Sequence, residues 1–308
     1  MVKKLFKKLM SITLFLIPCV LLSQTAPNLG TASSFALFTS IGNLSNSGGA
    51  SNVTGNVGTN SGTYSSLGTV NGTVHVANAT SSQASIDVNS AYSYLSGVTT
   101  GATLGTSLGG GQVLTANVYS IAAASSLSGT LVLDGQGNPN ALFIIKINGG
   151  LAFSSNANVV LTNSASICNV YWRVNGPVTL GASSIFRGTI LANGLIDVAN
   201  MASLLGRGLS IGGAITLKNN MVSVSLPPVA SVISASGTTS LCTGGSVVLS
   251  GNIGGTWSNS STASSITVNS TGTYYVTNTT TCGSITSNSI SVVVNPIPTV
   301  TVNSGTIC

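Results

Sequence analysis

A single pattern recurs as Gly176-Pro177-Val178-Thr179-Leu180, as Gly194-Leu195-Ile196-Asp197-Val198 and as Gly213-Ala214-Ile215-Thr216-Leu217, with glycines 18 and then 19 residues apart. An apolar, polar, apolar triplet follows in each copy, which is the period of two expected of a strand with one buried face. An earlier copy begins at Gly150 if an insertion around residues 163–168 is allowed. Such a fixed period predicts a solenoid, in which each coil stacks on the next.

Each copy is flanked by two further segments. The upstream ones are predicted strands at residues 170–174, 189–192 and 208–211, and we expect Trp172, Ile190 and Leu209 to share one inward column. The downstream ones are short and polar, at residues 182–184, 200–203 and 219–221. Three short segments per coil predict a mainly β protein built as a triangular β-solenoid.

Residues 80–98 change period and predict one helix. Its apolar stripe includes Ala84, Val88, Ala91 and Leu95, with Ser81 or Ser82 as the cap of its first turn. The helix is too rich in serine to be stable alone, so we expect it to pack along the solenoid.

Few residues are available for chemistry, because charged residues make up only 4% of the chain. Beyond the first eight residues there are five basic and three acidic side chains and one histidine, His75. The sequence therefore predicts no enzyme, no metal site, no cofactor and no nucleic-acid partner.

The first 25 residues are predicted to be a signal peptide, because four lysines precede the apolar run 14–22. We expect a secreted or cell-surface protein, a monomer, with no membrane-spanning segment in its mature chain. In that setting Cys242 and Cys282 are predicted to pair, and Cys168 is interpreted as a buried small apolar residue.

Pro227-Pro228 marks a predicted linker. We expect the solenoid domain over residues 26–226, a small β-sandwich over 227–298 and the start of a further repeat over 299–308.

Small polar residues on a stiff β-surface offer a grid, with coils about 4.8 Å apart and alternate residues of a strand about 6.6 Å apart. That grid is close to the oxygen repeat of ice and favours ordered water on the surface. The alternative is that serine, threonine and asparagine only keep an exported solenoid soluble.

Residues 28–224 resemble the secreted microbial ice-binding proteins of the β-solenoid type with a flanking helix. The resemblance rests on segments that include Asn28-Leu29-Gly30-Thr31-Ala32-Ser33-Ser34-Phe35, Asn169-Val170-Tyr171-Trp172-Arg173-Val174, Phe186-Arg187-Gly188-Thr189-Ile190 and Leu205-Gly206-Arg207-Gly208. It implies a right-handed, discontinuous β-helix whose N-terminal coils lie beside C-terminal ones, and an ice crystal surface as the partner. Residues 229–308 are similar to bacterial immunoglobulin-like (Ig-like) surface repeats, which implies a spacer or anchor.

The ice face of this family often repeats Thr, Ala or Gly, any residue, then Thr or Asn once per coil, and this chain lacks threonine at the matching positions. We expect the candidate ice-binding residues on the short polar segments, with those of two N-terminal coils next: Ser155, Asn156, Asn158, Ala182, Ser183, Ser184, Asn200, Ala202, Ser203, Asn219, Thr54 and Thr59. Ala202 is predicted to face outward. A non-catalytic surface adhesin on the same scaffold is the alternative function.

Overall fold

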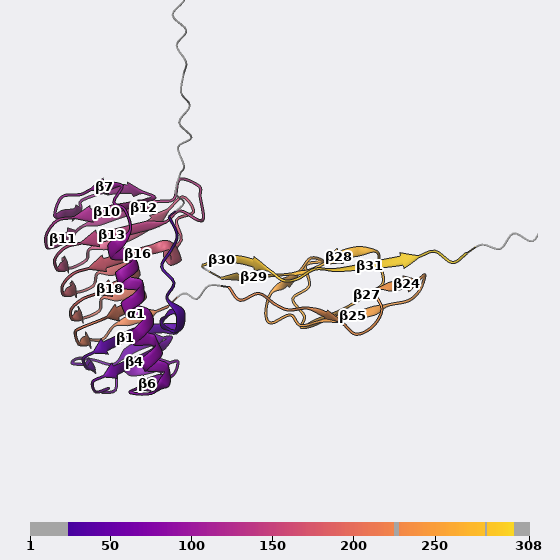
Figure 1. Ribbon diagram of the computed structural model, residues 1–308, viewed down its shortest axis with the longest axis horizontal. Coiled ribbons are helices and arrows are strands. Elements are labelled where there is room, and N and C mark those ends of the chain that lie inside the picture. The colour runs from indigo at the N-terminus through magenta and orange to yellow at the C-terminus, as the bar shows by residue number, and fades with distance from the viewer. Residues whose placement is uncertain (1–23, 225–227, 281, 299–308) are drawn as a thin grey trace, which may run out of the picture.

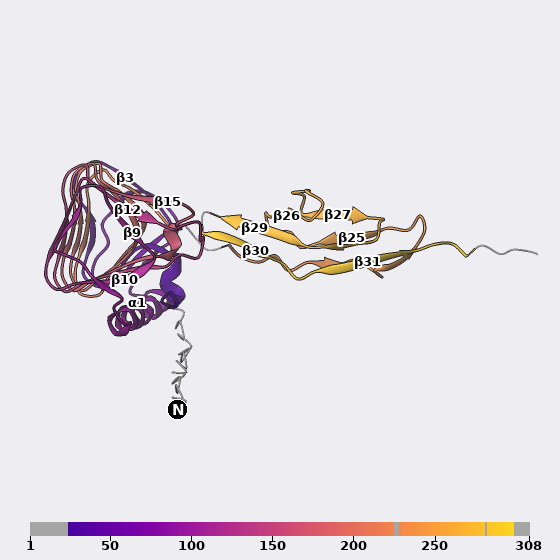
Figure 2. The ribbon, with the colours of Figure 1, turned by 90° about the horizontal axis from the view of Figure 1, so that it is seen from above.

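The chain winds into coils of three short strands, with one helix beside them, and then continues into a second group of strands (Figure 1). This computed structural model describes residues 24–224, 228–280 and 282–298. The predicted signal peptide and the predicted start of a further repeat lie outside the described residues, apart from Gln24 and Thr25. Seen along its axis the solenoid is triangular, as the sequence predicts (Figure 2).

The three sides of the triangle are called the helix face, the seven-stranded face and the third face. The helix face contains β1 (Phe35–Ile41), β4 (Asn56–Ser61), β6 (Val74–Val76), β7 (Ala102–Thr103), β10 (Asn117–Ile121), β13 (Phe143–Ile147), β16 (Val170–Val174) and the second halves of β18 (Ile185–Ala192) and β20 (Ser203–Ser210). The seven-stranded face contains β2 (Leu44–Asn46), β8 (Ser107–Gly109), β11 (Ser125–Ser128), β14 (Leu151–Phe153), β17 (Val178–Leu180), β19 (Ile196–Val198) and β21 (Ile215–Leu217). The third face contains β3 (Ser51–Thr54), β5 (Gly68–Asn71), β9 (Gln112–Thr115), β12 (Thr130–Asp134), β15 (Asn158–Thr162), β22 (Met221–Ser223) and the first halves of β18 and β20.

The solenoid is discontinuous in the chain, as the resemblance implies. Strand β1 pairs in parallel with β20, and β2 and β3 pair with β21 and β22, so the N-terminal coils stack on the last C-terminal coil. Helix α1 (Ala79–Gly97) then returns along the stack to β7 at the other end (Figure 1). Its 19 residues span about 28 Å, or about six coil spacings.

Helix α1 begins one residue earlier than predicted, because Asn78 and not Ser81 or Ser82 is its N-cap. The Asn78 side chain accepts from the Ser81 amide at 2.9 Å, and the Ser81 hydroxyl accepts from the Asn78 amide at 2.8 Å, which forms a capping box. The predicted stripe is confirmed, since Ala84, Val88 and Leu95 are buried against the helix face.

Glycines form one corner of the triangle. Strands β18 and β20 bend there at Gly188 and Gly206, whose φ angles are +116° and +133°. A Cβ on Gly206 would lie 1.9 Å from the carbonyl oxygen of Gly188 in the neighbouring coil. Only glycine permits both this backbone angle and this approach.

Two predictions about the coil are wrong. The polar segments at 182–183 and 200–201 are turns, and the third strand of each coil starts after them. Trp172 pairs with Ile190, but Ile190 pairs with Gly208, so Leu209 points outward and packs under α1. Gly208 therefore occupies the position in the inward column, next to Ile190, at which the repeat predicts a large apolar side chain.

The second group of strands has its own hydrophobic cluster, which includes Trp257, Leu249 and Val276. It consists of three small, mostly antiparallel sheets formed by β23 (Ser234–Ala235), β24 (Ser240–Cys242), β25 (Val247–Ser250), β26 (Thr256–Trp257), β27 (Ser265–Val268), β28 (Gly272–Tyr274), β29 (Val276–Thr280), β30 (Gly283–Thr286) and β31 (Ile290–Asn295). We call it the second unit.

The predicted Cys242–Cys282 disulfide is wrong. Cys282 pairs with Cys168, with Cα atoms 5.3 Å apart, whereas Cys242 is an exposed free thiol. Cys242 ends β24, whereas Cys282 lies in the turn between β29 and β30, the two strands that lie nearest the solenoid in Figure 1. Cys168 precedes β16 in the short helix η2 (Ile167–Asn169). Because it forms a disulfide and is only half-buried, it is not the buried small apolar residue that the sequence suggested.

Candidate functional site

The three faces of the solenoid differ in what covers them. Helix α1 and the short helix η1 (Gly30–Ser34) cover the helix face through Phe38, Ile144 and Leu191. The second unit is attached at the corner between the helix face and the third face. Cys168, which is bonded to Cys282 of the second unit, lies at that corner between β15 of the third face and β16 of the helix face. The seven-stranded face lies on the opposite side of the solenoid. In Figure 1 its strand β11 is on the side away from β30 of the second unit. This face is therefore free of the rest of the described chain.

One side chain per coil projects from the middle of the seven-stranded face. Parallel register aligns these residues across all seven strands. In spatial order they are Ser107, Ser126, Ala152, Thr179, Asp197, Thr216 and Ser45. Six of the seven are small and uncharged, so the face is a flat row of hydroxyl and methyl groups.

The sequence contained the signal for this row. Thr179, Asp197 and Thr216 are the polar members of the three triplets that define the repeat, and their neighbours on both sides are buried. Most of the predicted site residues lie instead on the turns that follow each triplet.

One ion pair lies at the edge of this row. The Lys218 ammonium is 3.8 Å from an Asp197 carboxylate oxygen, and both side chains remain partly exposed. Asp197 thus interrupts the uncharged row between Thr179 and Thr216.

The corner turns beside the row hold several predicted site residues. Asn156, Ser183, Met201 and Asn219 occupy the same left-handed position in successive coils, with φ angles between +55° and +60°. A ladder of backbone hydrogen bonds connects these turns from coil to coil. Five predicted residues are exposed on them: Ser155, Asn156, Ser183, Asn200 and Asn219. Ala182 is half-buried at the same corner.

Asn219 is in a different column from the one predicted. The amide of Met201 donates to the carbonyl of Lys218, which aligns Asn219 with Met201 rather than with Asn200. The last turn is therefore displaced by one residue relative to the predicted alignment.

Three predicted site residues do not reach the surface. Ala202 and Ser184 are fully buried, on the turn position that points into the core, so the expectation that Ala202 faces outward is wrong. Thr59 is also buried, and its hydroxyl donates to the Gly42 carbonyl at 2.8 Å. None of the three lies on an exposed face.

The remaining predicted residues lie on the third face. Thr54 is exposed there, and Asn158 and Ser203 are half-buried. This face is less even than the seven-stranded one, because the side chain of Met221 is 53% exposed and Arg187 reaches across to the Asn158 side chain at 2.8 Å.

The ionisable groups under the helix serve packing. Arg207 is buried and its Nε donates to the Ser33 carbonyl at 2.9 Å. Burial lowers the pKa of Arg207 and raises that of the neighbouring Tyr171 hydroxyl. The Lys146 ammonium donates to the Val98 carbonyl at the end of α1, where a cation is favourable.

No metal-binding cluster occurs within the described residues, where histidine, cysteine, aspartate and glutamate nowhere gather in threes. The His75 ring packs at a tilt against Phe35, with ring centroids 5.4 Å apart. In the same ranges, no helix has the length and apolar character needed to cross a membrane.

The family model described as Ice-binding-like matches residues 28–223, which is the whole solenoid with its helix. The chain belongs to this ice-binding-like family. Its solenoid is similar to the crystal structure of an ice-binding protein from an Antarctic Flavobacteriaceae bacterium, with 44% identity and a TM-score of 0.63 over 65% of this chain and 47% of that one. It is also similar to the ice-binding protein of the Antarctic ascomycete Antarctomyces psychrotrophicus, with 32% identity and a TM-score of 0.62 over 65% of this chain and 98% of that one.

Among sequence relatives, the ice-binding protein of Nostoc sp. is 36% identical over 153 residues. That alignment covers 49% of this chain and 56% of the relative. The matched part of this chain thus spans little more than half the length of that relative.

Proposed function

We propose that this chain binds ice through the seven-stranded face and slows the growth or recrystallisation of ice crystals. The observation that carries the proposal is the aligned row of small residues on a flat parallel sheet that nothing else in the described chain covers. Membership of the ice-binding-like family and the names of the relatives support it.

The sheet supplies the register that ice requires. Adjacent coils repeat at about 4.8 Å, and alternate residues along a strand repeat at about 6.6 Å, which reaches from the row to the turn residues that border it. Hydroxyls and methyls held on that grid order water in a lattice-like layer, which matches a crystal plane over many contacts at once. The exposed turn residues Ser155, Ser183 and Asn200 extend this surface along one border.

The test compares two threonine-to-tyrosine variants. Thr179→Tyr places a bulky ring in the centre of the row, and Thr54→Tyr places the same ring on the third face. We expect Thr179→Tyr to lose most thermal hysteresis and recrystallisation inhibition, and Thr54→Tyr to retain both. Circular dichroism melts of both variants check that the fold is intact.

The reverse result, activity lost in Thr54→Tyr and kept in Thr179→Tyr, would assign ice binding to the third face. An inactive parent chain would contradict ice binding altogether. It would favour the non-catalytic surface adhesin, whose supporting observation is the second unit projecting from the solenoid.

We infer the remaining organisation from the sequence and the family. Residues 1–25 are a signal peptide, residues 26–226 are the ice-binding domain with a right-handed winding, and residues 227–298 are an Ig-like spacer. The mature protein is secreted or held at the cell surface, is monomeric and acts without catalysis. Intact mass of the exported protein tests the signal peptide, because a mature form that retains Lys3 would contradict it.

A further inference from the structure

The second unit is connected to the solenoid at two covalent points. One is the chain itself, between Val224 and Pro228. The other is the Cys168–Cys282 disulfide, which closes a loop of 114 residues in sequence. A unit held only by a short linker would pivot, which is the usual behaviour of domains joined by a small interface.

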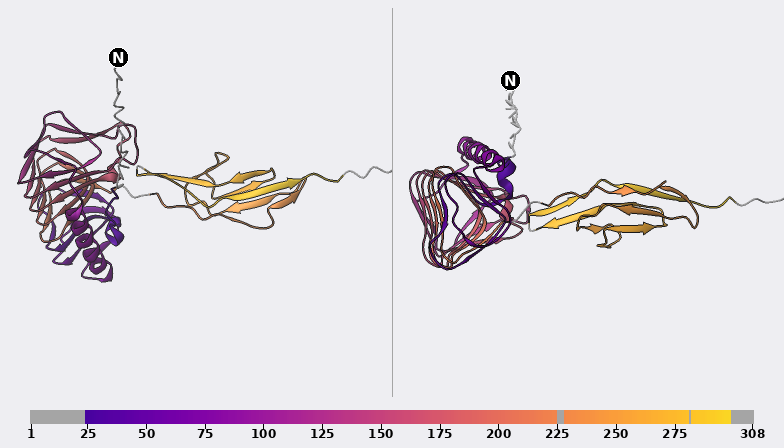
Figure 3. Two further views of the ribbon diagram at one scale, coloured as in Figure 1. Left: turned by 45° about the horizontal axis from the view of Figure 1, so that its top comes forward. Right: turned by 90° about the horizontal axis from the view of Figure 1, so that it is seen from below.

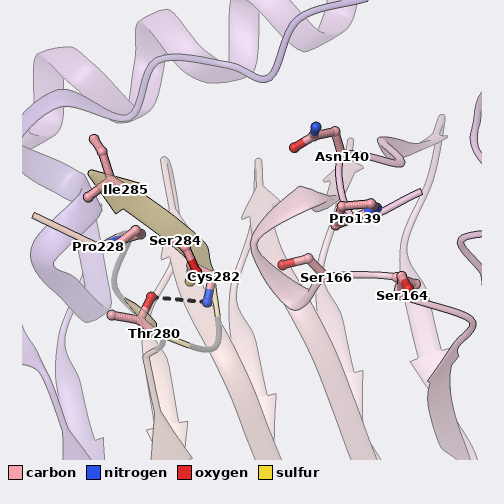
Figure 4. Close-up of a pocket in the computed structure, with 10 residues that line it drawn as sticks. Pro139, Asn140, Ser164, Ser166, Pro228, Thr280, Cys282, Ser284 and Ile285 are labelled. Carbon is pink, nitrogen blue, oxygen red and sulfur yellow. Dashed lines mark hydrogen bonds between the residues drawn. The ribbon is translucent and has the colours of Figure 1, made fainter. Parts of the chain in front are cut away.

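Apolar packing does not hold the two parts together. The hydrophobic clusters of the described residues lie within the solenoid or within the second unit, and none crosses between them. A cavity of about 770 Å³ separates them, lined by Asn140 and Ser166 of the solenoid and by Pro228, Thr280, Cys282 and Ile285 near the second unit (Figure 4). The junction is therefore partly hollow, and the disulfide lies at its border.

The position of the disulfide determines the direction in which the second unit extends from the solenoid. Cys168 lies at the corner opposite the seven-stranded face, and Cys282 lies at the near end of the second unit. In the views along the solenoid axis the second unit extends away from that corner (Figures 2 and 3). Strand β31 continues to the far end, so whatever follows residue 298 is connected on the side remote from the seven-stranded face.

We propose that the Cys168–Cys282 disulfide is an orientation lock that keeps the seven-stranded face directed away from the far end of the second unit. The inference rests on the proposed ice-binding function of that face. An anchored chain then presents its ice-binding face outward without a search over orientations. Because the lock does not touch the face itself, it matters for an anchored chain and not for a free one.

The first measurement is a distance distribution between two spin labels in the full chain. One label is attached to the free thiol of Cys242 at the far end, and the other to Ser126→Cys on β11, with Cys308→Ser as the common background. We expect a narrow distribution with the disulfide present and a several-fold wider one in Cys168→Ser/Cys282→Ser. Equal widths would overturn the lock, as would peptide mapping that finds Cys282 bonded to another cysteine.

The second measurement separates the lock from the function. Full chains without labels are attached to beads through a C-terminal tag, and capture of the beads by growing ice is counted. We expect Cys168→Ser/Cys282→Ser to lose several-fold in bead capture while its thermal hysteresis in free solution stays at the parent level. Cys242→Ser is the matched control, and we expect it to change neither.

Equal capture of parent and double variant would overturn the lock and leave ice binding intact. Loss of free-solution activity in the double variant would also overturn it, because the disulfide would then act on the face itself. A parent chain with no free-solution activity would overturn the proposed function, while the label distances would still decide whether the lock exists.

Discussion

Ala202 shows how a small residue can belong to the core of a solenoid rather than to its surface. It is fully buried at a corner, on the same inward turn position as Ala157 and Ser184. We expect Ala202→Tyr to destabilise the fold by about 1–3 kcal/mol or more, because the ring has no space between stacked coils. A circular dichroism melt measures this, and an unchanged melting temperature would place Ala202 at the surface after all.

Asp197 is the charged interruption in the row on the seven-stranded face. We expect Asp197→Thr/Lys218→Thr to raise thermal hysteresis, because threonine would continue the row between Thr179 and Thr216 and remove two strongly hydrated groups. The ion pair is exposed, so its loss should cost less than about 1 kcal/mol of stability. Lower activity in the double variant would mean that the carboxylate itself contributes to binding.

Helix α1 is stabilised by the capping box at Asn78 as well as by the burial of its apolar stripe. Replacing Asn78 removes one side of the capping box, and we expect Asn78→Ala to cost about 1 kcal/mol of unfolding free energy. Chemical denaturation measures the loss. Asn89→Ala on the exposed side of the same helix is the control, since its side-chain amide caps neither helix end and only donates to the Ser85 carbonyl within the helix at 2.7 Å.

The interface under α1 and η1 also predicts that the stability of the fold decreases at alkaline pH. Burial raises the pKa of Tyr171 above its usual 10.0, with Arg207 acting in the opposite direction. The folded state therefore favours the neutral phenol, so this contribution is complete below pH 10 and is lost as the pH rises through the raised pKa. We expect Tyr171→Phe to lose less stability than the parent between about pH 9 and about pH 11 in urea titrations.

At the scale of the whole molecule, each part has a core of its own. The solenoid clusters and the second-unit cluster share no residue, so we expect residues 24–224 with Cys168→Ser to fold alone. Its melting temperature should match that of the solenoid transition in the reduced full chain. A solenoid fragment that aggregates or melts far earlier would show that the second unit is needed for folding.

The sequence by itself determined the coil. The period of 18 or 19 residues, the buried neighbours of Thr179 and the stripe of α1 are all local patterns, because alternation and helical spacing depend only on the chain's own geometry. The family resemblance added the order of the coils, in which β1 stacks on β20.

Only the tertiary structure decided which residues lie on the exposed seven-stranded face and which cysteines pair. A turn that is one residue longer or shorter changes which side chain points inward, so the repeat predicts the coil of Ala202 and Asn219 correctly but not the direction of Ala202 or the column of Asn219. Cys168 and Cys282 are 114 positions apart, and no local pattern shows that two parts of the chain with separate hydrophobic cores meet at one corner. Contacts across such distances follow from how finished coils and sheets fit together, which is a property of the assembled chain.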